Sequence, residues 1–337
     1  MSGMSSASAP DRRWRWSETK PAMTFGPPRT FLGLPPELSA YDTARVVLLP
    51  VPYDATTSYR AGTRDGARAI VDASMQIELY NADLDCEPAE VGIHTLDPLE
   101  PDFRAPDHML ARVREATDRL LEDGKFPFLL GGEHSLTSGA VAACKARHSD
   151  LGILHLDAHA DLRDEYHGTP FSHACAMRRV VDLGCPLTSV GIRSVAAEEA
   201  EFRRGPTPVP VTTISAAEIA RVRYDSTKLD ALWDRIVATL PPTIYITVDL
   251  DVFDPSLMEA VGTPEPGGLD WWEVTGLLRR ACAARTVVGA DVVELAPAEG
   301  PESCAFAAAK LTYSIIAYVT ADREALAEID RRADLGG

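Results

Sequence analysis

Two short groups of acidic and histidine side chains, each following directly on an apolar run, constrain the fold of this chain more than any other feature. The apolar runs at residues 151–156 and 244–248 are rich in aliphatic and β-branched residues, which is typical of buried parallel strands. The polar side chains that follow are Asp157, His159 and Asp161 in one group and Asp249 and Asp251 in the other. The spacing of two residues points each group to one face of an extended backbone. Since open α/β sheets form their sites beyond the carboxyl ends of the strands, these side chains are predicted to converge.

A third strand-like run, at residues 126–130, leads into Gly131, Gly132, Glu133 and His134 and adds a histidine to the same predicted edge. Taken singly, each motif has a structural explanation, because Asp and His often complete turns and caps. An Asp-x-Asp pair after a strand also occurs in enzymes of many kinds. Burying four carboxylates together without cations is very costly, however. The joint pattern therefore favours a metal site over a structural cluster.

The ligand types indicate the kind of metal ion. Carboxylates with some imidazole suit hard or borderline cations such as Mn²⁺, whereas tetrahedral zinc sites use fewer ligands and favour cysteine and histidine. Four Asp and two His exceed the needs of one tetrahedral ion, so a pair of ions is the economical explanation. Paired ions roughly 3.5–4 Å apart generate a hydroxide at neutral pH and orient it for attack. The sequence thus predicts metal-assisted hydrolysis.

The three motifs resemble those of the ureohydrolases, the family of arginase and agmatinase. Residues 131–135 (Gly-Gly-Glu-His-Ser), 155–161 (His-Leu-Asp-Ala-His-Ala-Asp) and 248–255 (Val-Asp-Leu-Asp-Val-Phe-Asp-Pro) match the family's metal motifs in order, within a likeness over roughly residues 40–325. The resemblance implies a three-layer α/β/α fold with a central, mostly parallel sheet in a single domain. It also implies a homotrimer or homohexamer and two Mn²⁺ ions per subunit. The ligands would be His134, Asp157, Asp161 and Asp249 for one ion, and Asp157, His159, Asp249 and Asp251 for the other, with Asp157 and Asp249 bridging.

Three catalytic side chains are expected: the resemblance implies His167 and Glu294, and the chemistry adds Asp161. The guanidinium carbon is a poor electrophile, so its hydrolysis needs a strong nucleophile held in line and a protonated leaving group. Asp161 would take the proton of the bound hydroxide and deliver it to the leaving nitrogen, and His167, in a His-Gly pair, would shuttle protons from solvent. Glu294 would hold the guanidinium through paired hydrogen bonds. The products are expected to be urea and an amine.

The loop between the second motif and His167 bears on the choice of substrate. Residues 162–166 lack the Ser-Gly-Asn pattern that arginases carry there, which argues against arginine. Asp164 and Glu165 are candidates for contacting the far ammonium of agmatine or N1-aminopropylagmatine, although solvated loop acids are an equally good explanation. Agmatinase-like hydrolysis to putrescine or spermidine, in polyamine synthesis, is therefore ranked first, with a small cationic guanidino compound as substrate.

Several alternatives stay open. The nearest is guanidinobutyrase or another guanidino-acid or guanidine hydrolase, and arginase is less favoured. Deacetylases share the fold but bind a single zinc ion, which six ligands argue against. An inactive metal-binding scaffold of the same fold would usually have lost ligands, and all six are present. His173 competes with His167 for the proton-shuttle role, and Cys175 lies close to it in the sequence.

Strand-like and helix-like segments alternate along the chain, which predicts one α/β domain over residues 41–330. Strands are expected at residues 45–50, 126–130, 151–156, 189–193, 244–250 and 287–293, and helices at 107–123, 226–240, 270–284 and 303–319. Residues 1–40 form an N-terminal extension, either flexible or packed on a neighbouring subunit. Its pronounced feature is the cluster Arg12-Arg13-Trp14-Arg15-Trp16.

Charge and composition limit the partners and the location. A net charge of −17 argues against nucleic acid and anionic membranes and suits an enzyme for cations. No apolar run follows the N-terminal arginines as in a secretory signal, and none is long enough to cross a bilayer, so a cytoplasmic protein is expected. The six cysteines show no Cys-x-x-Cys pair and are expected to be buried free thiols.

Overall fold

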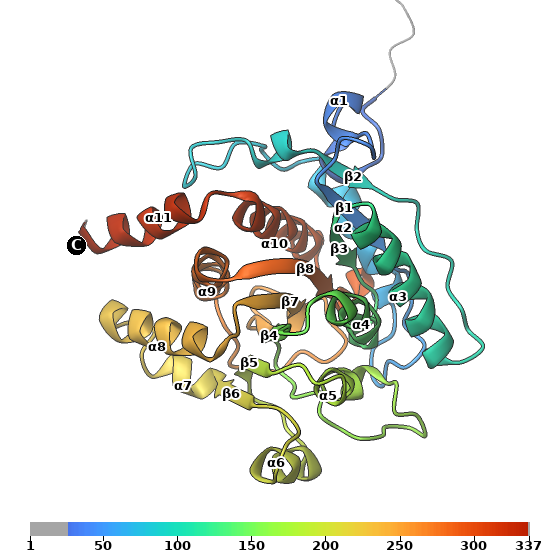
Figure 1. Ribbon diagram of the computed structural model, residues 1–337, viewed down its shortest axis with the longest axis vertical. Helices are drawn as coiled ribbons and strands as arrows, with labels where there is room; N and C mark the ends of the chain where they lie inside the picture. Colours follow the sequence, from blue (N-terminus) through green and yellow to red (C-terminus); the bar gives the residue numbers. More distant parts are fainter. Residues whose placement is uncertain (1–25, 336–337) are drawn as a thin grey trace, which may run out of the picture.

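An eight-stranded, entirely parallel sheet forms the centre of the molecule in a computed structural model, which describes residues 26–335 (Figure 1). The strands are β1 (Val46–Pro50), β2 (Ile93–Thr95), β3 (Phe126–Leu130), β4 (Gly152–Leu156), β5 (Leu187–Ile192), β6 (Val211–Ser215), β7 (Thr243–Asp249) and β8 (Thr286–Val293). Their order across the sheet is β2-β1-β3-β8-β7-β4-β5-β6. Because β8 is last in the chain yet lies between β3 and β7, segments far apart in sequence become neighbours at the centre.

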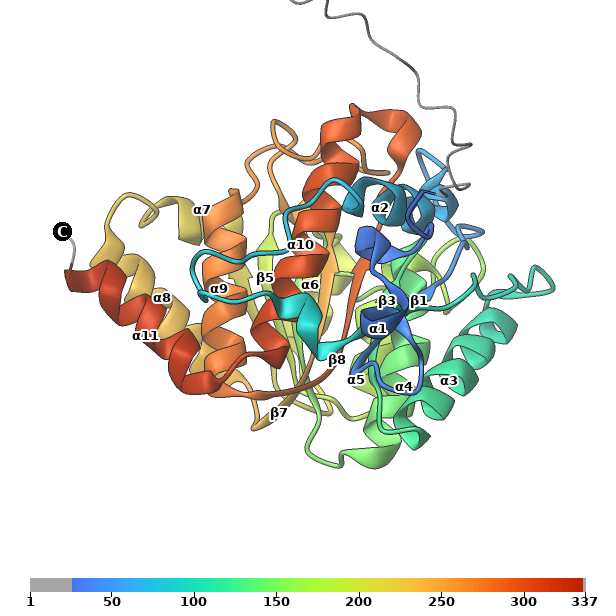
Figure 2. The ribbon, with the colours of Figure 1, turned by 90° about the horizontal axis from the view of Figure 1, so that it is seen from above.

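Helices cover both faces of the sheet, which explains why its central strands are continuous apolar runs. On one face α3, α4 and α5 pack through residues such as Met109, Val141 and Met177. On the other, α2 and α7 to α10 pack through residues such as Ile236 and Leu311. Figures 1 and 2 show α3 and α4 together on one side and α9 and α10 on the other. The predicted α/β class and its three-layer arrangement are confirmed.

The helix bounds agree with the expected ones to within a residue or two where helices were predicted. The helices are α1 (Pro36–Ser39), α2 (Gly66–Ser74), α3 (Pro106–Glu122), α4 (Thr137–Arg147), α5 (Ala176–Asp182), α6 (Ala197–Arg204), α7 (Ala216–Ala220), α8 (Ser226–Thr239), α9 (Trp271–Ala284), α10 (Glu302–Thr320) and α11 (Arg323–Leu335). Short 3-10 turns that matter for the site are η4 (His134–Leu136), η5 (His173–Cys175) and η6 (Leu250–Val252).

Helix α10 is long and apolar enough to cross a membrane by length and composition, contrary to the expectation that no run is. Most of its side chains are buried, however, and it packs against α2 and α9. Leu311, Ile315 and Ile316 are fully enclosed in the core. Helix α10 therefore has the packing of a core helix.

The N-terminal extension is described only from residue 26 onward, so the cluster at residues 12–16 lies outside the described residues. Within the described part, Phe31 and Leu34 are buried in the main core. The backbone N–H of Leu32 donates to Ser74 Oγ at 2.7 Å, which fixes this segment to the end of α2. All six cysteines are free, as expected; Cys86 is exposed and the other five are buried.

Candidate functional site

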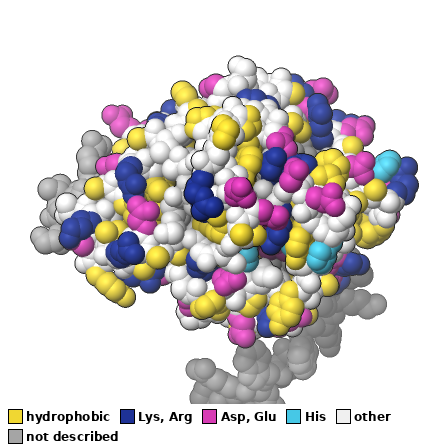
Figure 3. Space-filling model, turned by 90° about the horizontal axis from the view of Figure 1, so that it is seen from below, with side chains coloured by type: hydrophobic (Ala, Val, Ile, Leu, Met, Phe, Trp, Pro, Cys, Tyr) yellow, Lys and Arg dark blue, Asp and Glu magenta, His cyan; other side chains and the backbone are white. Residues whose placement is uncertain are grey.

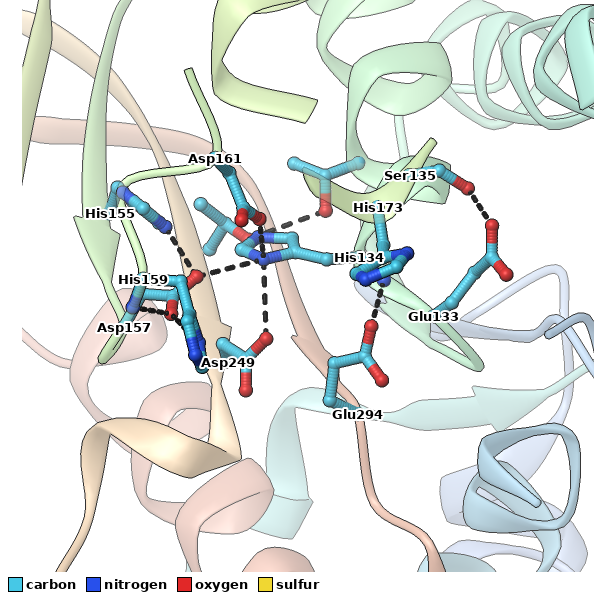
Figure 4. Close-up of polar contacts among 12 residues, drawn as sticks. Glu133, His134, Ser135, His155, Asp157, His159, Asp161, His173, Asp249 and Glu294 are labelled. Atoms are coloured by element: carbon cyan, nitrogen blue, oxygen red, sulfur yellow. Dashed lines mark hydrogen bonds and ion pairs between the residues drawn. The ribbon is translucent and has the colours of Figure 1, made fainter. Parts of the chain in front are cut away.

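The carboxyl ends of the four central strands bring the predicted ligand motifs together. Strand β3 leads through Gly131 to His134, β7 ends at Asp249, and β4 leads into Asp157. Because β8 pairs with both β3 and β7, Glu294 emerges beside them at the same edge. Figure 4 shows these side chains pointing toward one another from separate elements. The sheet order thus gathers groups that are 160 residues apart in the chain.

The first group of ligand-type atoms surrounds Nδ1 of His134. This nitrogen lies 3.0 Å from Asp157 Oδ2, 3.1 Å from Asp161 Oδ2 and 3.3 Å from Asp249 Oδ2 (Figure 4). Although these distances are short, Nδ1 is buried and has no hydrogen-bond partner among the described residues. One nitrogen facing three carboxylate oxygens, without hydrogen bonds between them, is the arrangement that ligands of a shared cation adopt.

The second group forms around His159, which is a quarter exposed. Its Nδ1 lies 2.9 Å from Asp251 Oδ2 and 3.5 Å from Asp157 Oδ1. Asp157 therefore contributes one carboxylate oxygen to each group. Asp249 is tied to the second group less directly, because its Oδ1 accepts a hydrogen bond from the backbone N–H of Asp251 at 2.9 Å. The structure brings together all six side chains that the sequence singled out as metal ligands.

The electrostatics of the two groups fit divalent cations. Burial raises the pKa of Asp249 well above its usual value, and the Asp251 and Asp157 carboxylates raise it further. Burial and the Asp157 carboxylate likewise raise the pKa of Asp251. The carboxyl groups of Asp249 and Asp251 therefore lose their negative charge when they lie this close together, unless a compensating positive charge is nearby. Buried carboxylates with imidazole suit Mn²⁺ better than a tetrahedral zinc ion, so the donor set fits the metal pair that the motifs predict.

Two buried networks behind the ligands were not found from the sequence. His134 Nε2 lies 3.0 Å from Thr247 Oγ1, and this hydroxyl lies 2.5 Å from Asp291 Oδ1. His155 Nε2 lies 2.8 Å from Asp157 Oδ2, while its Nδ1 faces Ser189 Oγ at 2.9 Å. The alternation along β4 and β7 was the available signal, because His155 and Thr247 each precede a ligand by two residues and so share its face of the strand.

One hydrogen bond of its backbone and one of its side chain hold Glu294 at the site. Its N–H donates to the Gly132 carbonyl at 2.8 Å, and its Oε1 accepts from the N–H of His134 at 2.7 Å. Burial raises the pKa of Glu294 well above its usual value, with the Glu133 carboxylate adding to the effect. A buried carboxylate in this setting favours a cationic partner.

Three of the candidate catalytic residues have a left-handed backbone. The φ angles are 52° at Asp161, 51° at His167 and 68° at Glu294, which non-glycine residues adopt rarely. Such conformations cluster at active sites, where the surrounding structure holds them in place. Their occurrence at three residues with proposed roles marks this edge of the sheet as a functional region.

A pocket of about 190 Å³ opens over the ligand groups. Its walls include Asp161, His159, His173 and Glu294, together with Arg60 and Arg163. His167 is not among the described residues that line this pocket. Its side chain is exposed, and its ring stacks on that of Tyr166 at a centroid distance of 4.1 Å. Tyr166 itself lines the pocket, so the stacking places His167 next to a residue of the pocket wall.

The loop acids Asp164 and Glu165 do not line this pocket in the described structure. Asp164 is largely exposed, and its Oδ1 lies 2.9 Å from Arg179 Nη2 and 3.4 Å from Arg178 Nη2. These guanidinium groups lower the pKa of Asp164. The geometry therefore favours the explanation that these residues are solvated loop acids rather than contacts for a substrate ammonium. Cys175 is buried, and burial raises the pKa of its thiol to about 11, which disfavours the reactive thiolate.

Comparisons with known proteins agree with this geometry. The family model described as the arginase family matches residues 44–317. The chain is 38% identical to N(1)-aminopropylagmatine ureohydrolase of Synechocystis sp. over 289 residues, covering 83% of this chain and 91% of that protein. It is 34% identical to agmatinase of Pyrococcus horikoshii, covering 81% and 91%. The crystal structure of agmatine ureohydrolase of Thermoplasma volcanium superimposes with a TM-score of 0.74 at 34% identity, covering 84% of this chain and 92% of that one.

Proposed function

The chain belongs to the arginase family, and from this premise we propose that it hydrolyses the guanidinium group of agmatine or N1-aminopropylagmatine. The products would be urea and, respectively, putrescine or spermidine, which places the enzyme in polyamine synthesis. The observation that carries the proposal is the convergence of four carboxylates and two imidazoles beneath one pocket. The names of the relatives supply the substrate class.

Two Mn²⁺ ions are the proposed cofactor. His134, Asp157, Asp161 and Asp249 would hold one ion, and Asp157, His159, Asp249 and Asp251 the other. The contribution of one Asp157 oxygen to each group supports its role as a bridge. When bound, such a pair supplies positive charge that makes water nucleophilic at neutral pH.

The remaining roles fall to side chains of the pocket and its rim. Glu294, anchored through Gly132 and the N–H of His134, would hold the planar guanidinium by charge-assisted hydrogen bonds. The carboxylate of Asp161 would accept a proton from the attacking water and pass it to the leaving nitrogen. His167, which is exposed and stacks on Tyr166, would exchange protons with solvent.

Two cationic side chains in the pocket wall bear on a second candidate substrate class. Arg60 and Arg163 line the pocket, where each also has an acidic partner: Arg60 Nε lies 3.4 Å from Glu299, and Arg163 Nη1 lies 2.6 Å from Glu198. A free guanidinium group at this place would favour a carboxylate end, as in guanidinobutyrate. Because both are already paired, the amine-terminated substrates are preferred in this proposal.

Urea release by the purified, Mn²⁺-loaded protein tests the proposal. Agmatine, N1-aminopropylagmatine, arginine, guanidinobutyrate and guanidine are compared side by side. Faster turnover of the two amine-terminated compounds is expected. Faster turnover of guanidinobutyrate would transfer the assignment to the guanidino-acid class, and no urea from any compound would leave an inactive metal-binding scaffold.

The role of Glu294 is tested by the variant Glu294→Gln, with Glu115→Gln on the surface of α3 as the matched control. The first variant removes the charge that would hold the guanidinium and is expected to raise KM strongly while two metal ions remain bound. The control variant Glu115→Gln is expected to have the same KM as the parent protein. A Glu294→Gln protein with unchanged KM would remove this residue from substrate binding.

The location and assembly are also proposals. We expect a cytoplasmic homotrimer or homohexamer that binds neither nucleic acid nor membranes. The face in Figure 3 supports only the expected lack of nucleic-acid and anionic-membrane binding, because its acidic and basic side chains are interspersed rather than gathered into one basic area. Sedimentation velocity on the untagged protein distinguishes the two assemblies from a monomer.

A further inference from the structure

We propose that His173 is a substrate-contacting residue, whose Nε2 accepts a hydrogen bond from the guanidino nitrogen that carries the alkyl chain. The inference rests on the proposed function and adds a residue to it. His173 lines the same pocket as Glu294 and Asp161, and Figure 4 shows its ring beside the ligand groups on the side of Glu294.

The backbone fixes His173 in this position. The residue begins η5, which packs against η4, the turn that carries His134. Its N–H donates to Thr56 Oγ1 at 3.0 Å, which joins η5 to the loop that forms another wall of the pocket. The ring is therefore held between two walls of the pocket rather than free to swing into solvent.

The hydroxyl groups around the ring select its tautomer. Thr56 Oγ1 donates its hydrogen to Glu133 Oε1 at 2.6 Å, so toward the ring, where it lies 3.4 Å from Nδ1, it can act only as an acceptor. Ser172 Oγ lies 3.2 Å from the same nitrogen and can also accept. The Thr56 contact favours a hydrogen on Nδ1, and the Ser172 contact is compatible with it, which leaves the lone pair on Nε2.

Nε2 is the atom left available for a ligand. Its protein contact is Ser58 Oγ at 3.4 Å, a long contact to a side chain that also lines the pocket. Burial lowers the pKa of His173, which keeps the ring neutral near pH 7. A neutral acceptor does not repel a cationic substrate, whereas a protonated imidazole would.

The substrate has hydrogens for this acceptor. A guanidinium group carries five N–H donors in a plane, and a carboxylate such as Glu294 accepts two of them side by side. The nitrogen bearing the chain keeps one N–H and, after cleavage, becomes the ammonium of the product amine. His173 Nε2 would therefore contact the same nitrogen in substrate and product.

A matched pair of amide variants isolates this contact. In His173→Gln the side-chain amide reaches the place of Nε2, whereas in His173→Asn it reaches only the place of Nδ1. The exposed His108 on α3 supplies controls with the same substitutions. The readouts are KM and kcat for agmatine, the Kd of putrescine for the Mn²⁺-loaded protein by calorimetry, and bound metal by mass spectrometry.

We expect His173→Asn to raise both KM and the putrescine Kd by about tenfold, as loss of one hydrogen bond to a charged group does. His173→Gln should keep values close to those of the parent, and both variants should keep their metal. An equal rise in KM and in the putrescine Kd in both variants, or no rise in His173→Asn, would overturn the inference. If the parent releases no urea from any guanidino compound, the proposed function fails instead, which is a separate result.

Discussion

Thr247 Oγ1 lies 2.5 Å from Asp291 Oδ1 while facing Nε2 of His134 at 3.0 Å. Since the hydroxyl hydrogen goes to Asp291, Thr247 can only accept from His134 Nε2, which therefore carries the hydrogen. The lone pair of His134 is then on Nδ1, the atom that faces the three carboxylates. Asp291, fully buried, is held in turn by the hydroxyls of Thr137 and Tyr245, both at 2.9 Å.

Removing the Thr247 hydroxyl should weaken metal binding. Thr247→Val keeps the shape of the side chain but leaves His134 without the partner that fixes its tautomer. The expected loss in Mn²⁺ affinity is about 10–100-fold, the usual effect of losing such a supporting hydrogen bond. Titration of the metal-free protein with Mn²⁺ measures it.

Thr243→Val, on the same strand but remote from the site, is the control for this experiment. Thr243 lies at the end of β7 opposite to the site, where its Oγ1 donates to Asp150. Loss of this hydroxyl should therefore leave the metal affinity unchanged. Equal affinities in Thr247→Val and the parent would show that the hydroxyl does not orient His134.

Because Asp157 has one oxygen in each ligand group, removing its carboxylate is expected to cost more bound metal than removing the carboxylate of Asp251. Asp157→Asn should lower the bound metal from two ions per subunit to less than one, because each of its oxygens faces a different histidine. Asp251→Asn should cost mainly the ion beside His159. Metal analysis after gel filtration distinguishes the two, with the exposed Asp150→Asn as a control. Retention of two ions in Asp157→Asn would rule out a bridging role.

The glycine before Glu133 is required by a close approach of two backbones. A methyl group at Gly132 would overlap the carbonyl of Tyr53, which accepts the N–H of Glu133 at 2.9 Å. Gly132→Ala should therefore lower the melting temperature markedly and reduce metal content, because the strand end that carries His134 must shift. Gly205→Ala, where the added methyl meets only ordinary contacts, is the comparison. Equal melting temperatures for the two variants would contradict the steric argument.

The pair formed by the buried Asp54 and the half-exposed Arg64 predicts how stability depends on pH. Burial alone would raise the pKa of Asp54, but hydrogen bonds from Arg64 and from the N–H of Gly62 outweigh it and lower the pKa. Because the folded state binds this proton less readily than the unfolded state, the stabilisation is present above about pH 4 and is lost as the pH falls below it.

Urea unfolding of the metal-free protein at pH 7 and near pH 3 tests this, because the loss begins only below about pH 4, the ordinary pKa of the carboxyl. The free energy of unfolding of Asp54→Asn should fall less on acidification than that of the parent. The exposed Asp65→Asn should behave as the parent does. An equal fall in Asp54→Asn and the parent would show that the pair does not contribute to acid sensitivity.

The sequence predicted the central strands well because both faces of those strands are covered. The run at residues 126–130 is observed without change as β3; β4 and β8 differ from prediction by one residue at one end, and β7 by one residue at each end. The edge strands β2 and β6 were missed. Their side chains are partly exposed, so they lack the continuous apolar run that marks a buried parallel strand.

The ligands could be predicted because their chemistry is local in the sequence, whereas their supports are not. Asp157, His159 and Asp161 stand out as a motif, but Asp291 reaches the site only through the pairing of β7 with β8. The same holds for His173, whose neighbours Thr56 and Ser58 are more than a hundred residues away. Helix α4 was missed because its alanines and small polar residues give little amphipathic pattern.

The position of β8 has a consequence for how the protein matures. This strand is the last of the sheet to be synthesised, yet it must enter between β3 and β7, which carry His134 and Asp249 at their ends. A nascent chain that ends before residue 286 therefore has every metal ligand in its sequence but not the strand that sets them at their final spacing. The proposed metal pair would bind tightly only to the completed sheet, so metal binding would stabilise the finished fold over partly formed ones.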